Sequence, residues 1–433
     1  MFKQTLAAVG ALSCLASTAN AATEIEWWHA MGGTLGEKVN SIAENFNASQ
    51  ADYKLVPVYK GNYTETMTAA IAAFRAKQQP HIVQVFEVGT ATMMGAKGAV
   101  YPVYQLMSDA GESFDPADYL AAVAGYYTDT DGNMLSMPFN SSTPVLYYNK
   151  DAFKKAGLED KAPNTWPEFE EAAKKLQAAG YACGMTTAWQ SWVQLENFSA
   201  WHNLPFGTKE NGFAGLDTEF QFNGPAQVKH ISQLAEWQKS KIFDYGGRRS
   251  DSAPKFYSEE CAMYMNSSAA YAGVKTNVKF EFGVGPMPYW PELASEPQNS
   301  IIGGATLWVL TGGESEEYKG VAKFFTYLSS PEVQADWHQF TGYLPITNAA
   351  ATLTEEQGFY KENPGTDVAI KQINNKAPTA NSKGLRFGNF VQIRDIINEE
   401  LEAVWAGDKS AQDALDTAAE RGNALLRKFE KAN

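Results

Sequence analysis

Basic residues are scarce in this chain of 433 residues. Lysine and arginine total 35 against 49 aspartates and glutamates, so the formal net charge at pH 7 is −14. Because binding to a phosphate backbone needs a basic surface, we expect no nucleic acid partner. An anionic small ligand fits such a chain only if one pocket is locally favourable for it.

Several catalytic signatures are also missing. The sequence contains no Gly-x-Ser-x-Gly elbow, no phosphate-loop lysine motif and no His-Glu-x-x-His pair, so we expect no cofactor, no metal and no catalytic residue. The segment 129–133 resembles a calcium loop, but Pro138 stands where such a loop needs its glutamate, which favours a hairpin turn. The histidines show no ligand spacing: His29, His81, His202, His230 and His338.

Long apolar runs are confined to the N-terminus. Residues 1–21 predict a cleavable signal peptide, with Lys3 ahead of an apolar run over 6–15 and small residues at 19–21. Acylation of Cys14 is the alternative, although the preceding leucine stands two residues ahead rather than three. We therefore expect export to the periplasm without an anchor.

Cysteine is nearly absent from the predicted mature chain, where only Cys183 and Cys261 remain. In an oxidising compartment the two thiols could pair, but a single sequence does not show whether their Cα atoms approach within ~7 Å. Two buried free thiols are the other interpretation.

The first third of the chain alternates strand and helix patterns. Strands are predicted at 24–28, 54–59 and 81–86, and helices at 35–46 and 66–76. This order predicts an α/β fold with a parallel sheet, whose ligands bind beyond the carboxyl ends of the strands. The loops 29–33, 60–63 and 87–90 are therefore the first candidates for a site.

A second α/β region is predicted after residue 150. Thr165 and Glu168 have capping-box spacing at the start of a helix over 167–176, and Ser410 with Asp413 has the spacing of a cap for the last helix. Segments rich in glycine, serine or proline at 135–145, 261–271 and 303–313 predict three crossings between two lobes. About 410 residues also exceed one ordinary core. We expect an N-terminal lobe of 22–138 and 272–310, and a C-terminal lobe of 139–271 and 311–433.

Several motifs resemble the bacterial extracellular solute-binding family that includes maltose-binding proteins. They are Trp27-Trp28-His29-Ala30-Met31, the Tyr-Tyr-Asn-Lys-Asp segment at 147–151, and Phe256-Tyr257 leading to Cys261-Ala262-Met263. The resemblance implies two lobes with a ligand cleft between them and three hinge crossings.

Further segments are similar to the members of that family that bind glycerol 3-phosphate. They lie at 60–63, 87–94, 189–201, 301–305, 342–345 and 392–394. The resemblance implies a carrier that captures sn-glycerol 3-phosphate, or glycerophosphodiesters such as glycerophosphocholine. It implies that these residues bind the ligand: Tyr63, Glu87, Ser142, Trp189, Trp192, Ser267, Gly304, Tyr343 and Arg394.

The chemistry of these residues suits a phosphorylated polyol. The guanidinium of Arg394 is expected to bind phosphate oxygens, and the serine and tyrosine hydroxyls to donate to them. Glu87 would repel phosphate, so we expect it at the other end, accepting from the glycerol hydroxyls. Trp189 and Trp192 are three residues apart, which on one helical turn places both indoles on a single face.

We expect a monomer that docks transiently on the permease of an ABC importer, whose ATPase subunits hydrolyse ATP. Two alternatives remain open. An oligosaccharide or another polyol would suit an aromatic cleft. A secreted glycerophosphodiesterase or glycosidase would instead consume its ligand, with Glu87 as a general base.

Overall fold

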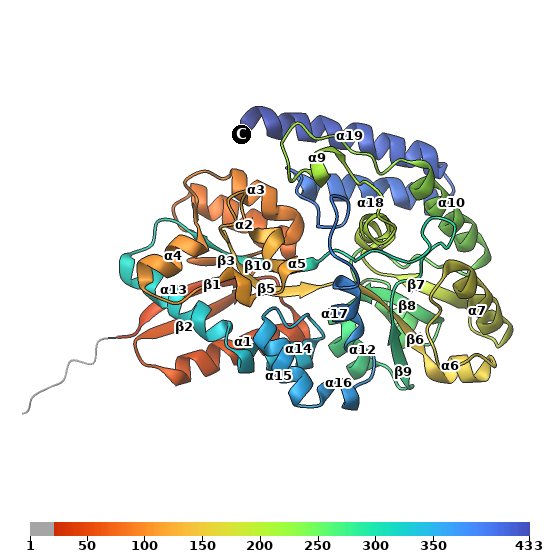
Figure 1. Ribbon diagram of the computed structural model, residues 1–433, viewed down its shortest axis with the longest axis horizontal. Coiled ribbons are helices and arrows are strands. Elements are labelled where there is room, and N and C mark those ends of the chain that lie inside the picture. Colours follow the sequence, from red (N-terminus) through yellow and green to blue (C-terminus); the bar gives the residue numbers. More distant parts are fainter. Residues whose placement is uncertain (1–20) are drawn as a thin grey trace, which may run out of the picture.

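The computed structural model describes residues 21–433, which form two lobes side by side along the long axis of the molecule (Figure 1). The predicted signal peptide lies outside the described residues apart from Ala21. Within the described chain, no helix is both long and apolar enough to cross a membrane.

The first sheet has the strand order β2-β1-β3-β10-β4, and β5 also pairs with β10. β1 pairs in parallel with β2 and β3, as the alternation of strands and helices predicts. β10 is antiparallel to β3, β4 and β5 because it enters from the opposite direction after a crossing. The strands are β1 (Thr23–His29), β2 (Tyr53–Tyr59), β3 (Ile82–Phe86), β4 (Val100–Tyr101), β5 (Met137–Ser142) and β10 (Gly303–Leu310).

The second sheet has the order β7-β8-β6-β9, in which only β7 and β8 are parallel. Its strands are β6 (Pro144–Asn149), β7 (Cys183–Thr187), β8 (Cys261–Ser267) and β9 (Phe282–Gly285). Cys183 and Cys261 face each other on β7 and β8, and a disulfide joins them with their Cα atoms 4.5 Å apart. This contact decides between the two interpretations that the sequence left open.

Helices cover both sheets (Figure 1). Those before β6 are α1 (Gly33–Ser49), α2 (Tyr63–Arg75), η1 (Glu87–Gly89), α3 (Thr90–Gly95), α4 (Val103–Ala110), η2 (Pro116–Asp118) and α5 (Ala121–Tyr127). Those after it are α6 (Lys150–Lys155), α7 (Trp166–Ala178), η3 (Trp192–Asn197), α8 (Phe198–Trp201), α9 (Thr208–Asn211), α10 (Pro225–Ser240), α11 (Ala253–Tyr257), η4 (Ser268–Ala270), α12 (Tyr271–Asn277), α13 (Ser315–Leu328), α14 (Pro331–Thr341), α15 (Asn348–Glu356), α16 (Phe359–Glu362), α17 (Val368–Ile373), α18 (Phe390–Ala406) and α19 (Ala411–Ala432).

Local caps explain where several helices begin. The predicted capping box at Thr165 and Glu168 is present at the start of α7, and the Ser410 side chain accepts the backbone N–H of Asp413 at the start of α19. A second capping box, Asn62 with Glu65, starts α2 directly after Gly61, whose φ is +88°. These caps satisfy backbone N–H groups that the first helical turn leaves without partners.

The chain crosses between the lobes three times within residues 21–433, but two crossings differ from the predicted segments. One lies between β5 and β6, as expected. The second lies between β9 and β10, which belong to different sheets, and the third lies between α15, which packs on α14, and α17, which packs on β6. The segment 261–271 instead returns to the second sheet, because it is followed by α12 and then by β9, which pairs with β6.

The predicted lobe boundaries are wrong in two places for the same reason. β9 belongs to the second sheet although it falls within 272–310, which was assigned to the N-terminal lobe. α13 packs on β1 of the first sheet although it falls within 311–433. Both errors follow from the crossings, because a segment rich in glycine and serine is compatible with a hinge and with an ordinary turn.

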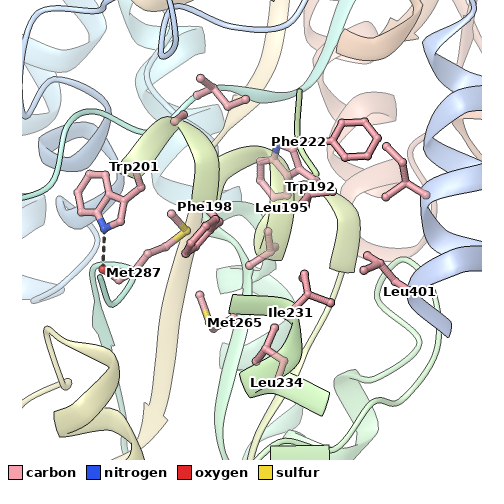
Figure 2. Close-up of a cluster of buried hydrophobic side chains, with 14 of the residues drawn as sticks. Trp192, Leu195, Phe198, Trp201, Phe222, Ile231, Leu234, Met265, Met287 and Leu401 are labelled. Atoms are coloured by element: carbon pink, nitrogen blue, oxygen red, sulfur yellow. Dashed lines mark hydrogen bonds between the residues drawn. The ribbon is translucent and has the colours of Figure 1, made fainter. Parts of the chain in front are cut away.

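A large apolar core supports the wall of the second lobe next to the first. Figure 2 shows Trp192, Leu195 and Phe198 of η3 and α8 among buried side chains such as Leu234 and Met265. The Nε1–H of Trp201 donates to the carbonyl of Met287 at 3.0 Å. Packing against this core therefore holds the helical segment that carries Trp192 in place.

Candidate ligand-binding site

A cavity of about 350 Å³ lies between the two lobes. Its walls include residues that come within a few positions after the ends of β1, β2, β3 and β7: Ala30, Met31, Asn62, Tyr63, Glu87 and Trp189. The three loops that the sequence predicted as site candidates therefore all contribute, as expected for the carboxyl ends of parallel strands.

All nine residues implied by the resemblance line this cavity. Those from the first lobe stand on α2, on η1 and at the facing ends of β5 and β10: Tyr63, Glu87, Ser142 and Gly304. Those from the second lobe stand before η3, on η3, at the end of β8 and on α18: Trp189, Trp192, Ser267 and Arg394. Tyr343 follows α14.

Arg394 is the centre of a buried ion cluster, which we define as Glu87, Glu196 and Arg394. Its Nε and Nη2 donate to the two carboxylate oxygens of Glu196 at 2.9 and 2.6 Å, a bidentate pair. The same Nη2 lies 2.7 Å from an oxygen of Glu87, which belongs to the other lobe. The exposed fractions are 5% for Glu87, 1% for Glu196 and 7% for Arg394.

The electrostatics of the cluster follow from its burial. Burial raises the pKa of Glu196, although the charge of Arg394 acts against this. Burial alone would lower the pKa of Arg394, but the carboxylates of Glu196 and Glu87 outweigh it and the pKa lies above its usual value. The guanidinium is therefore charged and already shared by two acids, and only its Nη1 protons are uncommitted to them.

The expectation that Glu87 sits away from Arg394 is wrong. The two side chains form a direct ion pair, so they occupy the same part of the cavity. Sequence reasoning placed Glu87 by its repulsion from phosphate and did not anticipate that the arginine would be neutralised by acids of its own.

Glu196 is one residue of the site that the sequence reasoning missed. It lies in η3, a π-helical segment, among apolar neighbours such as Trp192, Val193 and Leu195. A charged residue in such a stretch is rarely buried without a partner, and that was the available signal. The partner could not be identified, because Arg394 is 198 residues further along the chain.

Tyr63, Ser142, Ser267 and Tyr343 form a second group, which we call the hydroxyl set. The Tyr63 oxygen accepts from Nδ2 of Asn140 at 2.8 Å, and Asn140 is held by Gln84 at 2.8 Å. Burial raises the pKa of both Tyr63 and Tyr343 above 10, so these hydroxyls keep their protons. Neutral donors therefore face the cavity.

Ser267 also begins a helical run. Its Oγ accepts the backbone N–H of Ala269 at 3.0 Å and caps η4, which leads into α12. Because that oxygen already accepts, its own proton remains available to a ligand. Helix N-termini favour anions, so this position suits an acidic group.

Two glycines shape the cavity where β10 begins. Gly304 has a φ of +96°, and a Cβ there would meet the carbonyl oxygen of Asn140 at 1.8 Å. A Cβ on Gly303 would meet the indole of Trp192 at 2.4 Å. Side chains at either position would push the strand away from β5 or from η3.

The two tryptophans both border the cavity but do not share a helical face. Trp189 has a φ of +45° and precedes the helix, and its N–H donates to the carbonyl of Arg249 at 2.8 Å. Trp192 lies within η3 and its Nε1–H donates to the carbonyl of Ile302 at 3.4 Å. Trp189 has a left-handed backbone and lies outside the helix, so the expectation that both indoles share one helical face is wrong.

The acidic segment at 129–133 is a turn, as predicted. Thr128 and Met134 form an antiparallel bridge, and an Asp129 carboxylate oxygen accepts the N–H groups of Asp131 and Asn133 at 2.9 Å. Among the residues described, no group of three or more potential ligands is arranged to hold a metal ion.

Comparison with known proteins identifies relatives along the whole chain. Residues 41–367 match the family model of the bacterial extracellular solute-binding proteins. The sn-glycerol-3-phosphate-binding periplasmic protein UgpB of Salmonella typhimurium is 55% identical over 430 residues, which cover 98% of each chain. The protein of the same name from Yersinia pseudotuberculosis is 55% identical over 419 residues, covering 96% of this chain and 95% of the relative.

Solved structures share the fold at lower identity. UgpB of Mycobacterium tuberculosis in complex with glycerophosphocholine has a TM-score of 0.78 and 22% identity, covering 94% of this chain and 99% of the other. Maltose-bound MalE3 of T. maritima has a TM-score of 0.76 and 20% identity, covering 93% of this chain and 100% of the other. At this identity, these likenesses carry the two-lobed fold and no statement about the ligand.

Proposed function

The chain belongs to the bacterial extracellular solute-binding protein family, and we propose that it captures sn-glycerol 3-phosphate in the cavity between its lobes. It carries the ligand through the periplasm to the permease of an ABC importer and releases it unchanged. Relatives of 55% identity that are named for this ligand support the proposal. One observation carries it: nine residues scattered from Tyr63 to Arg394 meet at one cavity.

The donors and acceptors of the cavity fit the two halves of this ligand. Ser142, Ser267 and Tyr343 offer hydroxyl protons to the phosphate oxygens, next to the N-terminus of η4. Glu87 offers a carboxylate that accepts from the glycerol hydroxyls, and Arg394 holds that carboxylate in place. The arginine therefore acts chiefly as a positioning group.

Contributions from both lobes explain how capture works. A ligand that contacts Glu87 and Ser142 of one lobe and Ser267 and Trp189 of the other binds the closed form better than the open form. Such differential affinity is what shifts a protein towards closure. A carrier must also release its cargo, so we expect micromolar or somewhat tighter affinity, about −8 to −10 kcal/mol.

Titration calorimetry tests the proposal with four ligands: glycerol 3-phosphate, glycerophosphocholine, maltose and inorganic phosphate. We expect binding of the first two, with much weaker or no binding of maltose and phosphate. The ligand should be recovered unchanged after prolonged incubation. Tight binding of maltose alone would make the chain a sugar carrier, and the release of free glycerol or choline would make it an enzyme.

A further inference from the structure

Arg249 lines the cavity on a loop that is fixed at several points. Both Nε and Nη2 of the neighbouring Arg248 donate to Glu402 at 2.7 Å, and Oγ of Ser252 donates to the carbonyl of Thr187 at 2.9 Å. The carbonyl of Arg249 itself accepts from Trp189 at 2.8 Å. The backbone is thus held, whereas the Arg249 side chain is exposed.

The charges around the cavity distinguish this arginine from Arg394. Four charged residues line the cavity in the part of the chain that the structure describes: Glu87, Arg249, Asp251 and Arg394. Arg394 is shared by two carboxylates, whereas the described residues include no carboxylate within 4.0 Å of the Arg249 guanidinium. Within the described residues, the guanidinium of Arg249 therefore bonds to no carboxylate, and its N–H donors can bond to a phosphate dianion in the cavity.

Arg249 also lies at the boundary between the main cavity and a smaller adjoining space. This adjoining space of about 80 Å³ shares six residues with the main cavity: Asn62, Tyr63, Phe86, Trp189, Arg249 and Arg394. In a phosphodiester the phosphate carries a second alcohol group. The adjoining space offers volume for that group. A monoester has an additional negative oxygen in place of that alcohol.

We propose that Arg249 is the cation that pairs with the ligand phosphate, and that it favours a phosphomonoester dianion over a phosphodiester. This inference rests on the proposed function. A guanidinium beside two negative oxygens gains more from a dianion than from a monoanion, because Coulomb attraction scales with charge. Lysine at this position keeps the charge but loses the planar pair of donors.

Changing the pH distinguishes charge pairing from a structural role. The second pKa of a phosphate monoester is near 6, so the ligand is mainly a dianion at pH 8 and a monoanion at pH 5. The groups that line the cavity and the adjoining space beside Arg249 are carboxylates, guanidinium groups and a phenol. They are Arg248 and Asp251 of its own loop, Tyr63 of α2, Glu87 of η1, and Arg394 and Asp395 of α18. A diester does not titrate between these values.

Calorimetry on wild type, R249Q and R249K with glycerol 3-phosphate and glycerophosphocholine at pH 5 and pH 8 tests the inference. We expect R249Q to weaken monoester binding roughly tenfold or more at pH 8, and roughly threefold at pH 5. Diester binding should weaken roughly threefold at both values, and R249K should recover part of the loss.

R75Q is the matched control. Arg75 is exposed at the end of α2 and makes no ion pair within the described chain, and along the helix it lies about 18 Å from Tyr63. We expect R75Q to bind both ligands as wild type does, which excludes a general effect of net charge. An R249Q protein that binds the monoester within twofold of wild type at pH 8, or that loses affinity for both ligands equally at pH 8, overturns the inference. Failure of wild type to bind glycerol 3-phosphate would instead overturn the proposed function, and the inference with it.

Discussion

The ion cluster and the hydroxyl set line the same cavity but differ in what they have left to offer a ligand. Within the ion cluster, the buried guanidinium of Arg394 is already paired with the carboxylates of Glu87 and Glu196. The hydroxyls of Ser142 and Ser267 are neutral, and their protons remain available. Residues that hold each other should matter for stability as well as for binding, whereas residues with free donors should matter mainly for binding.

The largest effect is expected from R394A, which removes the cation of the ion cluster. Glu87 and Glu196 then remain buried without a partner, and breaking a buried pair in this way costs about 3–5 kcal/mol of unfolding free energy. Glycerol 3-phosphate binding should be lost as well, and R394K should restore little of either. Urea denaturation and calorimetry measure both quantities.

The pH dependence of that loss identifies its cause. Burial raises the pKa of Glu196, and without the guanidinium this pKa rises further above that of the unfolded chain. A raised pKa favours the folded state at low pH, so R394A should approach wild type at pH 5 and fall furthest below it at pH 7. R248A is the control, because Arg248 and Glu402 form a partly exposed pair worth about 0–1 kcal/mol. Equal losses in R394A and R248A would mean that the cluster is no more than a surface ion pair.

S142A should show the opposite behaviour. Losing one hydroxyl that donates to a charged phosphate weakens binding by about 1.5–3 kcal/mol, while the unfolding free energy stays within about 1 kcal/mol of wild type. S136A removes another buried serine of the same lobe, which bonds to Thr306 at 2.8 Å and does not line the cavity, and it should leave affinity unchanged. If S142A binds normally, the hydroxyl set does not hold the phosphate.

E87Q should affect the binding of glycerol 3-phosphate but not the binding of inorganic phosphate. The amide keeps the size of Glu87 but removes an acceptor for the glycerol hydroxyls, so glycerol 3-phosphate should bind about 1–2 kcal/mol more weakly. Weak binding of inorganic phosphate, which has no such hydroxyls, should not decrease. Competition titrations with both ligands measure the difference. A parallel loss of both would indicate that Glu87 acts on the whole cavity.

The smallest effect concerns His338, which supports the hydroxyl set through Tyr343. Its Nδ1 donates to the carbonyl of Tyr343, and its Nε2 accepts from the Tyr360 hydroxyl at 3.0 Å. Burial lowers the pKa of His338 to about 4, below the 6.5 of an unfolded histidine. The unfolded chain therefore binds more protons between these values, and stability falls as the pH drops from 6.5 towards 4.

At pH 5.5 this histidine should account for about 1 kcal/mol of lost stability relative to pH 7. Thermal unfolding of wild type and H338Q across this range measures the contribution, since His29 and His202 also have pKa values lowered to about 4 by burial and remain in both proteins. Identical pH profiles for the two proteins would show that His338 does not contribute.

Three strands of the first lobe and two helix starts of the second could be predicted because their signals are local. β1, β2 and β3 follow from short apolar strands, and the caps of α7 and α19 from two residues each. The nine cavity residues came from the resemblance to a family, since a serine or a tyrosine alone carries no mark of a site. Their meeting at one cavity is a property of the fold.

What could not be predicted depends on contacts across long separations. Glu196 meets Arg394 only after α18 packs against the second lobe, and β9 joins β6 only because the chain turns back after α12. Trp189, which has a φ of +45°, donates its backbone N–H to Arg249, a residue far along the chain. The contact between Glu196 and Arg394 gives the cavity its charge distribution, in which Arg394 is bonded to two carboxylates.

A crystal structure of the protein with glycerol 3-phosphate tests the division between the two groups most directly. The account predicts the ligand enclosed between the lobes, with its glycerol hydroxyls bonded to Glu87 and its phosphate bonded to Ser142 and Ser267. The Arg394–Glu196 pair should remain intact. A phosphate bonded to Arg394 in place of Glu87 and Glu196 would contradict it.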